Sequence, residues 1–268
     1  MTLFTLLLLA IIQGLTEFLP ISSSAHLVLL HEINGTGSEG LALDVAVHLG
    51  SIIAVIGYFR TESAAAARGL GHLLRGRTGG GEARLALNLI LATVPLVFAG
   101  GLVVAMDWSD ALRNITVIGW AMIGFGILLW VIDKRAPQTG RTADWSLRQA
   151  LIMGLWQVLA LIPGTSRAGI TITGARALGM ERHDAARIAM LMSIPALLAA
   201  GGVLAIDVAR SEAGPDLLWQ AAIAAVFAFG SAWLALAIMM RLLARVSFTP
   251  YVIYRVGLGV VLLGFAYA

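Results

Sequence analysis

The sequence contains no cysteine, which excludes disulfide bonds and thiolate metal sites. It is also poor in charge, since Asp, Glu, Lys and Arg make up 12% of its residues, compared with about 25% in soluble domains. Residues 1–12 carry no basic leader and no clear small-residue cleavage site, so we expect this apolar stretch to be retained structure rather than a signal peptide. Hydrophobic residues make up 59% of the chain, and its mean hydropathy is +0.89. These properties predict an integral membrane protein.

Six apolar runs are long enough to cross a bilayer, which requires about 20 residues. They cover residues 43–59, 85–106, 115–132, 185–206, 217–240 and 251–267. Two shorter apolar pieces, 2–19 and 149–162, each end at a proline that is followed by hydroxyl side chains. Short helical stretches follow them, at 24–31 and 168–178. We expect each pair to form a re-entrant helix-loop-helix, because irregular backbone at membrane depth is tolerated where it lines a protein cavity.

The spans and re-entrant pairs divide into two halves, residues 1–132 and 149–268, within a single membrane domain covering 1–268. Each half contains one re-entrant pair and three spans. Because three is an odd number, the second half must be inverted relative to the first, and its hairpin enters from the opposite face. The sequence therefore predicts an all-α integral membrane protein with six transmembrane helices plus two re-entrant helix-loop-helix pairs in an inverted-topology repeat.

The charged residues predict the orientation of this protein in the membrane. We expect four arginine-rich loops, all on one side: 60–84, 134–148, 176–187 and 241–245. Acidic residues collect on the other side, opposed only by Arg113 and Arg210: Glu32, Glu39, Asp107, Asp110, Asp207, Glu212 and Asp216. The positive-inside rule makes the arginine-rich side cytoplasmic, so both termini and the first hairpin open to the outside. The pI of 9.8 results from these arginines between the apolar runs, which set the topology. We therefore expect no nucleic-acid partner.

Each half contains one polar segment within its re-entrant pair. Aligning Pro20 with Pro163 places Ser23 on Ser166 and Ser24 on Arg167. Ser22 then falls on Thr165. Polar and ionisable groups at membrane depth are costly, so they mark by default a functional site that faces protein or water.

The first segment combines a carboxylate, three hydroxyls and a histidine. Gln13 and Glu17 are four residues apart and share a helix face, and Ser23 and His26 can share a face at the start of the next helix. This combination is typical of a nucleophile with acid and base partners. The alternative is that the three serines only cap the second helix: Ser22, Ser23 and Ser24.

The second segment has the groups that bind phosphate. Gly164 lets the backbone approach a ligand closely, while Thr165 and Ser166 offer hydroxyls. The helix that follows presents free N–H groups to an anion. Arg167 adds a planar guanidinium that can hold two phosphate oxygens. The alternative is an arginine that extends to the interface or pairs with Glu17 for structure.

Together these segments resemble the motifs of the undecaprenyl-diphosphate phosphatases, bacterial membrane enzymes that recycle the lipid carrier of cell-wall synthesis. The family's first motif is matched by Gln13, Glu17, Phe18, Leu19, Pro20, Ser22, Ser23 and His26. Its second motif is matched by Pro163, Gly164, Ser166, Arg167 and Gly169. The stretch from Asp44 to Ser51, which includes His48, extends the resemblance. Two positions depart from the usual pattern, because Ala168 stands where the family has a serine and Gln13 replaces the commoner glutamate.

The resemblance implies hydrolysis of a polyprenyl diphosphate to the monophosphate and inorganic phosphate, in the bacterial plasma (inner) membrane. It makes Ser23 the nucleophile, His26 the acid and base, and Glu17 a base or a ligand, with Gln13, of Mg²⁺ or Ca²⁺. The phosphate-binding residues would be Ser22, Ser24, Gly164, Thr165, Ser166 and Arg167. A lipid flippase or secondary transporter with the same architecture and a non-catalytic lipid-binding scaffold are the alternatives. Whether the protein is a monomer or a homodimer stays open.

Overall fold

The computed structural model describes residues 2–34, 40–108, 112, 114–210 and 215–267. The regular elements of this part of the chain are helices, so the protein is all-α, as predicted. The first half contains α1 Leu3–Glu17, α2 Ser23–Asn34, α3 Gly40–Tyr58, α4 Arg60–Leu74, α5 Gly81–Ala105 and α7 Ile115–Arg135. The second half contains η1 Thr142–Asp144, α8 Leu147–Val158, η2 Leu159–Leu161, α9 Arg167–Ala177, α10 Arg182–Arg210, α11 Pro215–Leu242 and α12 Thr249–Tyr267.

Five helices are long and apolar enough to cross a membrane: α5, α7, α10, α11 and α12. Leu43–Tyr58, within α3, meets the same criterion together with α4, from which it is separated by a bend of 96°. The described residues therefore contain five spans, or six if the bent pair is one span. The prediction of a multi-pass membrane protein is confirmed.

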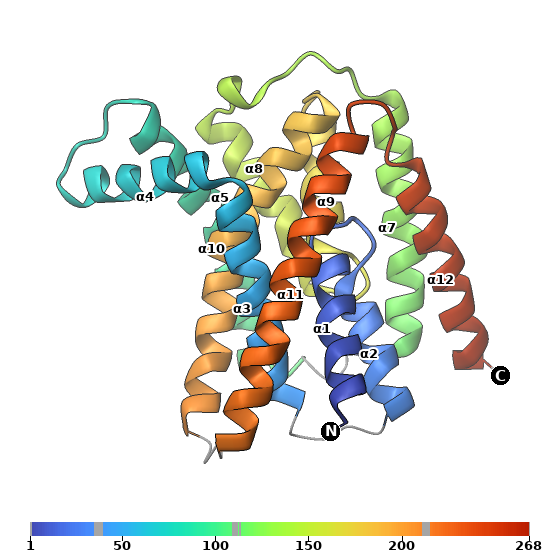
Figure 1. Ribbon diagram of the computed structural model, residues 1–268. Helices are drawn as coiled ribbons and strands as arrows, with labels where there is room; N and C mark the ends of the chain where they lie inside the picture. Colours follow the sequence, from blue (N-terminus) through green and yellow to red (C-terminus); the bar gives the residue numbers. More distant parts are fainter. Residues whose placement is uncertain (1, 35–39, 109–111, 113, 211–214, 268) are drawn as a thin grey trace.

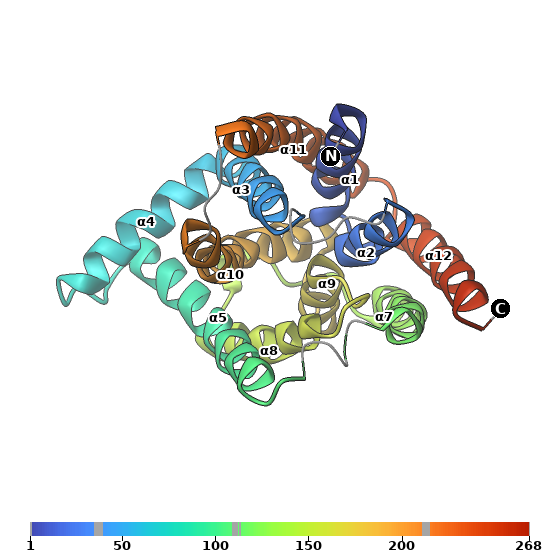
Figure 2. The same ribbon diagram turned by 90° about the horizontal axis from the view of Figure 1, so that it is seen from below.

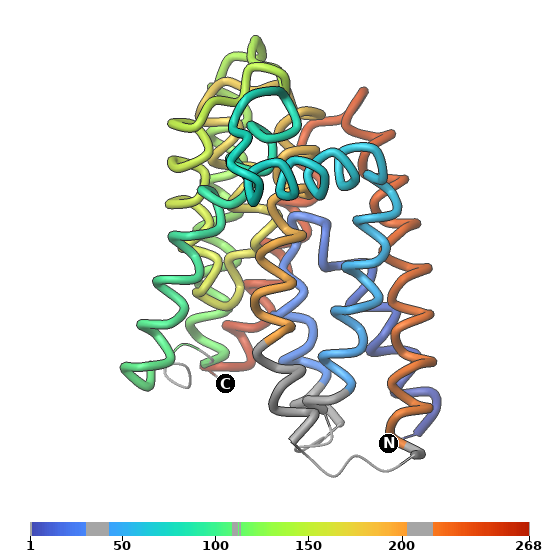
Figure 3. Tube along the Cα trace, turned by 90° about the vertical axis from the view of Figure 1, so that its left-hand side faces the viewer, coloured from blue at the N-terminus to red at the C-terminus, as the bar shows by residue number. Residues whose placement is uncertain are grey.

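The prediction of a loop over 60–84 is wrong for its first part, because Arg60–Leu74 forms helix α4. Four consecutive alanines, residues 64–67, favour a helix here. The helix turns away from α3 because its charged residues are costly in hydrocarbon, and it runs across the bundle axis near one end (Figures 2 and 3). It packs closely on α5, since a Cβ on Gly69 would lie 2.0 Å from the carbonyl oxygen of Glu82.

The two shortest apolar helices, α1 and α8, do not cross the molecule. An α-helix rises about 1.5 Å per residue, so the 15 residues of α1 and the 12 of α8 are shorter than a hydrocarbon core of roughly 30 Å. Each is followed by a loop and by a short helix, α2 or α9, that turns back toward the end from which the chain came (Figure 1). This arrangement is the re-entrant one that the sequence predicts.

The loops of both hairpins end at a serine with a positive φ angle. Ser22 has φ +72° and Ser166 has φ +66°, and the next helix begins directly afterwards, at Ser23 and at Arg167. The proline-based alignment of Ser23 with Ser166 is therefore wrong by one residue, and Arg167 is the counterpart of Ser23. The second loop accommodates its extra residue through Gly164, whose φ of +90° is unfavourable for residues with a side chain.

The arginine-rich segments gather at one end of the bundle. Figure 1 shows α4, the α7–α8 connection and the α11–α12 turn at this end, and both termini toward the other. A buried ion-pair network fixes α9 there, because Arg176 and Arg182 both bind the carboxylate of Asp133 on α7. Four residues predicted for the opposite face lie outside the described residues: Glu39, Asp110, Arg113 and Glu212.

Candidate active site

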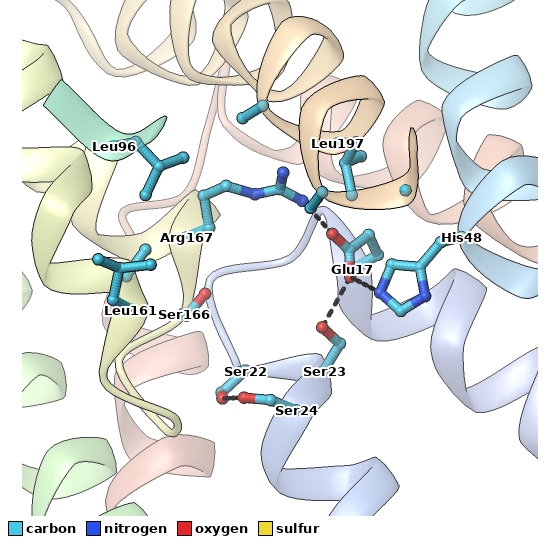
Figure 4. A pocket seen from close by; sticks show the side chains of 14 residues that line it. Glu17, Ser22, Ser23, Ser24, His48, Leu96, Leu161, Ser166, Arg167 and Leu197 are labelled. Atoms are coloured by element: carbon cyan, nitrogen blue, oxygen red, sulfur yellow. Dashed lines mark hydrogen bonds and ion pairs between the residues drawn. The ribbon is translucent and has the colours of Figure 1, made fainter. Parts of the chain in front are cut away.

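A cavity of about 260 Å³ lies between the tips of the two hairpins and helices α3, α5 and α10 (Figure 4). Its polar lining consists of Glu17, Ser22, Ser23, Ser24, His48, Ser166 and Arg167. Its apolar lining consists of Leu96, Ala160, Leu161, Ala196, Leu197, Ala200 and Gly201. Six of the residues predicted from the sequence therefore meet in one cavity with a polar and an apolar wall.

Glu17 is the centre of the polar wall. It is the last residue of α1, its side chain is 5% exposed, and both of its carboxylate oxygens are occupied. Oε2 accepts hydrogen bonds from Gln13 Nε2 at 2.8 Å and from Ser23 Oγ at 2.7 Å. Oε1 forms an ion pair with the guanidinium of Arg167. The predicted sharing of a helix face by Gln13 and Glu17 is confirmed, and the carboxylate joins the two hairpins.

The hydroxyl of Ser23 serves this carboxylate rather than capping its helix. Ser23 is the first residue of α2, and its Oγ donates to Glu17 Oε2. Among the serines in the two loops, Ser166 has the cap role, since its Oγ accepts from the N–H of Gly169 at 3.1 Å. A hydroxyl that donates to a buried carboxylate has the arrangement of a nucleophile with its base.

Arg167 occupies the same position at the start of α9. Its Nη2 contacts Glu17, its Nη1 lies 3.5 Å from the carbonyl oxygen of Ser193, and its side chain is 17% exposed. The alternative that Arg167 pairs with Glu17 is thus observed. It is compatible with phosphate binding, because the guanidinium faces the cavity (Figure 4) and carries donors that a phosphate can share.

Gly164 and Thr165 support the second hairpin from behind and do not line the cavity. A Cβ on Gly164 would lie 2.5 Å from the carbonyl oxygen of Ile118, so only glycine permits this contact with α7. The carbonyls of Gly164 and Thr165 accept hydrogen bonds from Nη2 of Arg255, on α12, at 3.1 and 2.8 Å. Arg255 is fully buried, and neither its Nε nor its Nη1 has a partner.

Arg255 was not among the residues predicted for the site, although an arginine within a predicted span is itself a signal. It forms no ion pair in the part of the chain that the structure describes. A fixed positive charge therefore stands behind the loop from which Arg167 and Ser166 enter the cavity.

The structure does not bring His26 into the cavity with Glu17 and Ser23. Its Nδ1 contacts the carbonyl oxygen of Ser22 at 2.7 Å, and its Nε2 contacts the hydroxyl of Tyr254 at 2.6 Å. The ring also stacks on Tyr254, with centroids 5.7 Å apart. Ser23 and His26 were expected to act on one side of α2. Instead, Ser23 contacts Glu17 on α1, and His26 contacts Tyr254 on α12.

His48, on α3, is the histidine that lines the cavity. Its Nδ1 lies 2.6 Å from the carbonyl oxygen of Asp44, and its Nε2 lies 4.0 Å from Oε2 of Glu17. Because a carbonyl only accepts, Nδ1 carries the proton, and in the neutral ring Nε2 is free to accept one. The signal for this residue in the sequence was a histidine inside a predicted span.

Among the described residues, no group of three or more histidine or acidic side chains could hold a metal ion. The predicted oxygen donors are the carboxylate of Glu17, whose oxygens accept the bonds described above, and Oε1 of Gln13, a buried atom without a partner. Magnesium is commonly held by one or two carboxylates together with substrate phosphates. The carboxylate and amide oxygens of this pair match that chemistry.

Comparison with known proteins agrees with these motifs. The family model of bacitracin resistance protein BacA matches residues 6–261. The undecaprenyl-diphosphatase of Dinoroseobacter shibae is 58% identical, and that of Ruegeria pomeroyi is 56% identical, each over the full length of both chains. Undecaprenyl-diphosphatase 2 of Stutzerimonas stutzeri is 44% identical over 98% of each chain. The chain therefore belongs to the bacitracin resistance protein BacA family.

Proposed function

We propose that this protein hydrolyses undecaprenyl diphosphate to undecaprenyl phosphate and inorganic phosphate. The observation that carries the proposal is the cavity in which a serine hydroxyl, a carboxylate and a guanidinium meet opposite an apolar wall. An amphipathic substrate matches both walls, with the diphosphate at the polar one and the first prenyl units at the apolar one. The names of the relatives support the same activity.

In this mechanism Arg167 binds the terminal phosphoryl group through two of its oxygens, and Ser23 is in line to attack it. As the bond from Ser23 Oγ to phosphorus forms, its proton moves to Glu17 Oε2, which lies 2.7 Å away. The bond to the bridging oxygen breaks, and undecaprenyl phosphate leaves. Transfer of the proton neutralises Glu17 and releases Arg167 from its ion pair, so that the guanidinium serves the phosphoryl group alone.

A water molecule completes the cycle by attacking the phosphoserine. His48 Nε2 accepts the proton of this water, and Glu17 returns its proton to Ser23 Oγ as the bond from Oγ to phosphorus breaks. His48 then gives its proton to the departing inorganic phosphate, which restores the neutral ring. The hydroxyls of Ser22 and Ser24 line the same cavity and contribute donors to the phosphate oxygens. When Mg²⁺ or Ca²⁺ is bound, Glu17 and Gln13 would hold it, and the cation would neutralise charge on the diphosphate.

The proposal places the protein in the bacterial inner membrane with its active site facing the periplasm or outside. Support comes from the arginine-rich segments at one end of the bundle and the termini toward the other (Figure 1). The substrate would then be the diphosphate left in the outer leaflet.

The test is phosphate release from undecaprenyl diphosphate by the purified protein, with Glu17→Gln as the inactive control. We expect turnover by the unmodified protein and loss of at least about 100-fold in the variant, the range for removal of a general base. If no phosphate is released and the protein instead moves a labelled lipid phosphate across proteoliposomes, the transporter alternative is correct.

A further inference from the structure

A second cavity, of about 560 Å³, lies beside α10 between α3, α4 and α5. Its lining is almost entirely apolar, with Leu70 of α4, Ile90 of α5 and Leu198 of α10 among the contributing side chains. Figure 2 shows how these helices are arranged: α4 leaves α3 at a steep angle, α5 begins beside α4, and α10 lies between α3 and α5. We refer to it as the lateral cleft.

The lateral cleft adjoins the apolar wall of the active-site cavity. Leu96 of α5 and Leu197 of α10 belong to that wall, while Ile90 and Ile194 of the same two helices line the cleft. Six residues of an α-helix span about 9 Å, so the two cavities are neighbours along the seam between α5 and α10. The active-site cavity of about 260 Å³ suits a diphosphate and a few atoms of its tail, so a long tail must continue elsewhere.

We propose that the lateral cleft holds the part of the prenyl tail that follows the first isoprene units of a long-chain polyprenyl diphosphate, an inference that rests on the proposed function. The seam runs from the active-site cavity toward the cytoplasmic end of the bundle. An undecaprenyl chain can follow this path, because it is longer than half of the roughly 30 Å hydrocarbon core. Lipid chains are as apolar as the cleft, so the transfer itself gains little free energy. Selection therefore depends on packing and on chain length, because a short prenyl chain fills only the end of the cleft nearest the active site.

Two exposed alanines of α4 allow the cleft to be filled without disturbing the bundle. Ala64 and Ala67 line the cleft, whereas Ala65 lies between them in sequence and does not. We expect Ala64→Trp and Ala67→Trp to raise KM for undecaprenyl diphosphate by at least about fivefold, the factor for roughly 1 kcal/mol of lost packing. The rise in KM for farnesyl diphosphate should be smaller, and Ala65→Trp should leave KM for both substrates unchanged.

A second measurement does not depend on turnover. Because the chain has no cysteine, Ala67→Cys provides a single thiol in the cleft. Undecaprenyl phosphate should slow its reaction with a membrane-permeant maleimide, and farnesyl phosphate should slow it less.

Equal effects of the tryptophan variants on both substrates, or none on either, would overturn the proposal, as would equal protection by both lipids. Absence of effect is also the result expected if a phospholipid chain occupies the cleft. The proposed function fails separately, if the unmodified protein hydrolyses neither diphosphate.

Discussion

Replacing Arg167 by lysine separates phosphate binding from structural pairing. In the structure the guanidinium pairs with Glu17, whose side chain is 5% exposed. Removal of the positive charge would leave that carboxylate without a counter-charge, and breaking a buried pair in this way costs about 3–5 kcal/mol. Lysine keeps the charge, so the loss of unfolding free energy in Arg167→Lys should be well below that range.

The effect of Arg167→Lys on turnover should be larger than its effect on the free energy of unfolding. A guanidinium holds two phosphate oxygens at once through paired N–H donors, whereas an ammonium is a point charge without this paired arrangement. If one hydrogen bond to a charged group is lost in the transition state, the cost is about 1.5–3 kcal/mol. With about 1.4 kcal/mol for each factor of ten, kcat/KM should fall roughly 10- to 150-fold.

The assay is phosphate release together with the melting temperature of the purified protein. Arg187→Lys is the matched control, because Arg187 forms an ion pair with Glu62 and does not line the active-site cavity. It should retain activity. Turnover by Arg167→Lys within about threefold of the unmodified protein would refute the bidentate role, since that difference is below 1 kcal/mol.

Three further predictions concern the nucleophile, the histidines and the orientation. Ser23→Ala should abolish phosphate release, while the free energy of unfolding should fall by less than about 1 kcal/mol, the cost of a lost helix cap. Substantial remaining activity would make water the attacking group. His48→Gln should reduce turnover about 100-fold and His26→Gln far less, as measured by phosphate release; the reverse order would restore the acid and base role to His26. A membrane-impermeant thiol reagent on intact cells should label Asp107→Cys and spare Arg77→Cys; the opposite pattern would overturn the proposed face of catalysis.

The sequence was sufficient for the architecture because bilayer thickness imposes strong rules on composition. Long apolar runs became α5, α7, α10, α11 and α12. The two proline and serine segments became hairpins. The helix α4 was not foreseen, because its charges suggested a loop while its alanines favour a helix.

Within the active site, local spacing was informative and long-range placement was not. Gln13 and Glu17 share a face because a helix fixes the relation of residues four apart. No such rule selects between His26 and His48, since the choice depends on how α3 and α12 pack around the hairpins. Arg255 was missed for the same reason, because it is brought to the second loop by the packing of α12.

The two hairpins contribute unlike groups from equivalent positions. In each, a serine of positive φ precedes a helix, and the first residue of that helix reaches Glu17: Ser23 contacts Oε2, and Arg167 contacts Oε1. One hairpin thus provides the hydroxyl and its base, and the other provides the cation. In the proposed mechanism, attack by Ser23 and tightening of Arg167 on the phosphoryl group are linked through one residue, because the carboxylate balances the guanidinium until a proton reaches it. An exchange of Ser23 and Arg167 between the hairpins would keep the charges but not this linkage, since Gln13 and His48 surround only Oε2.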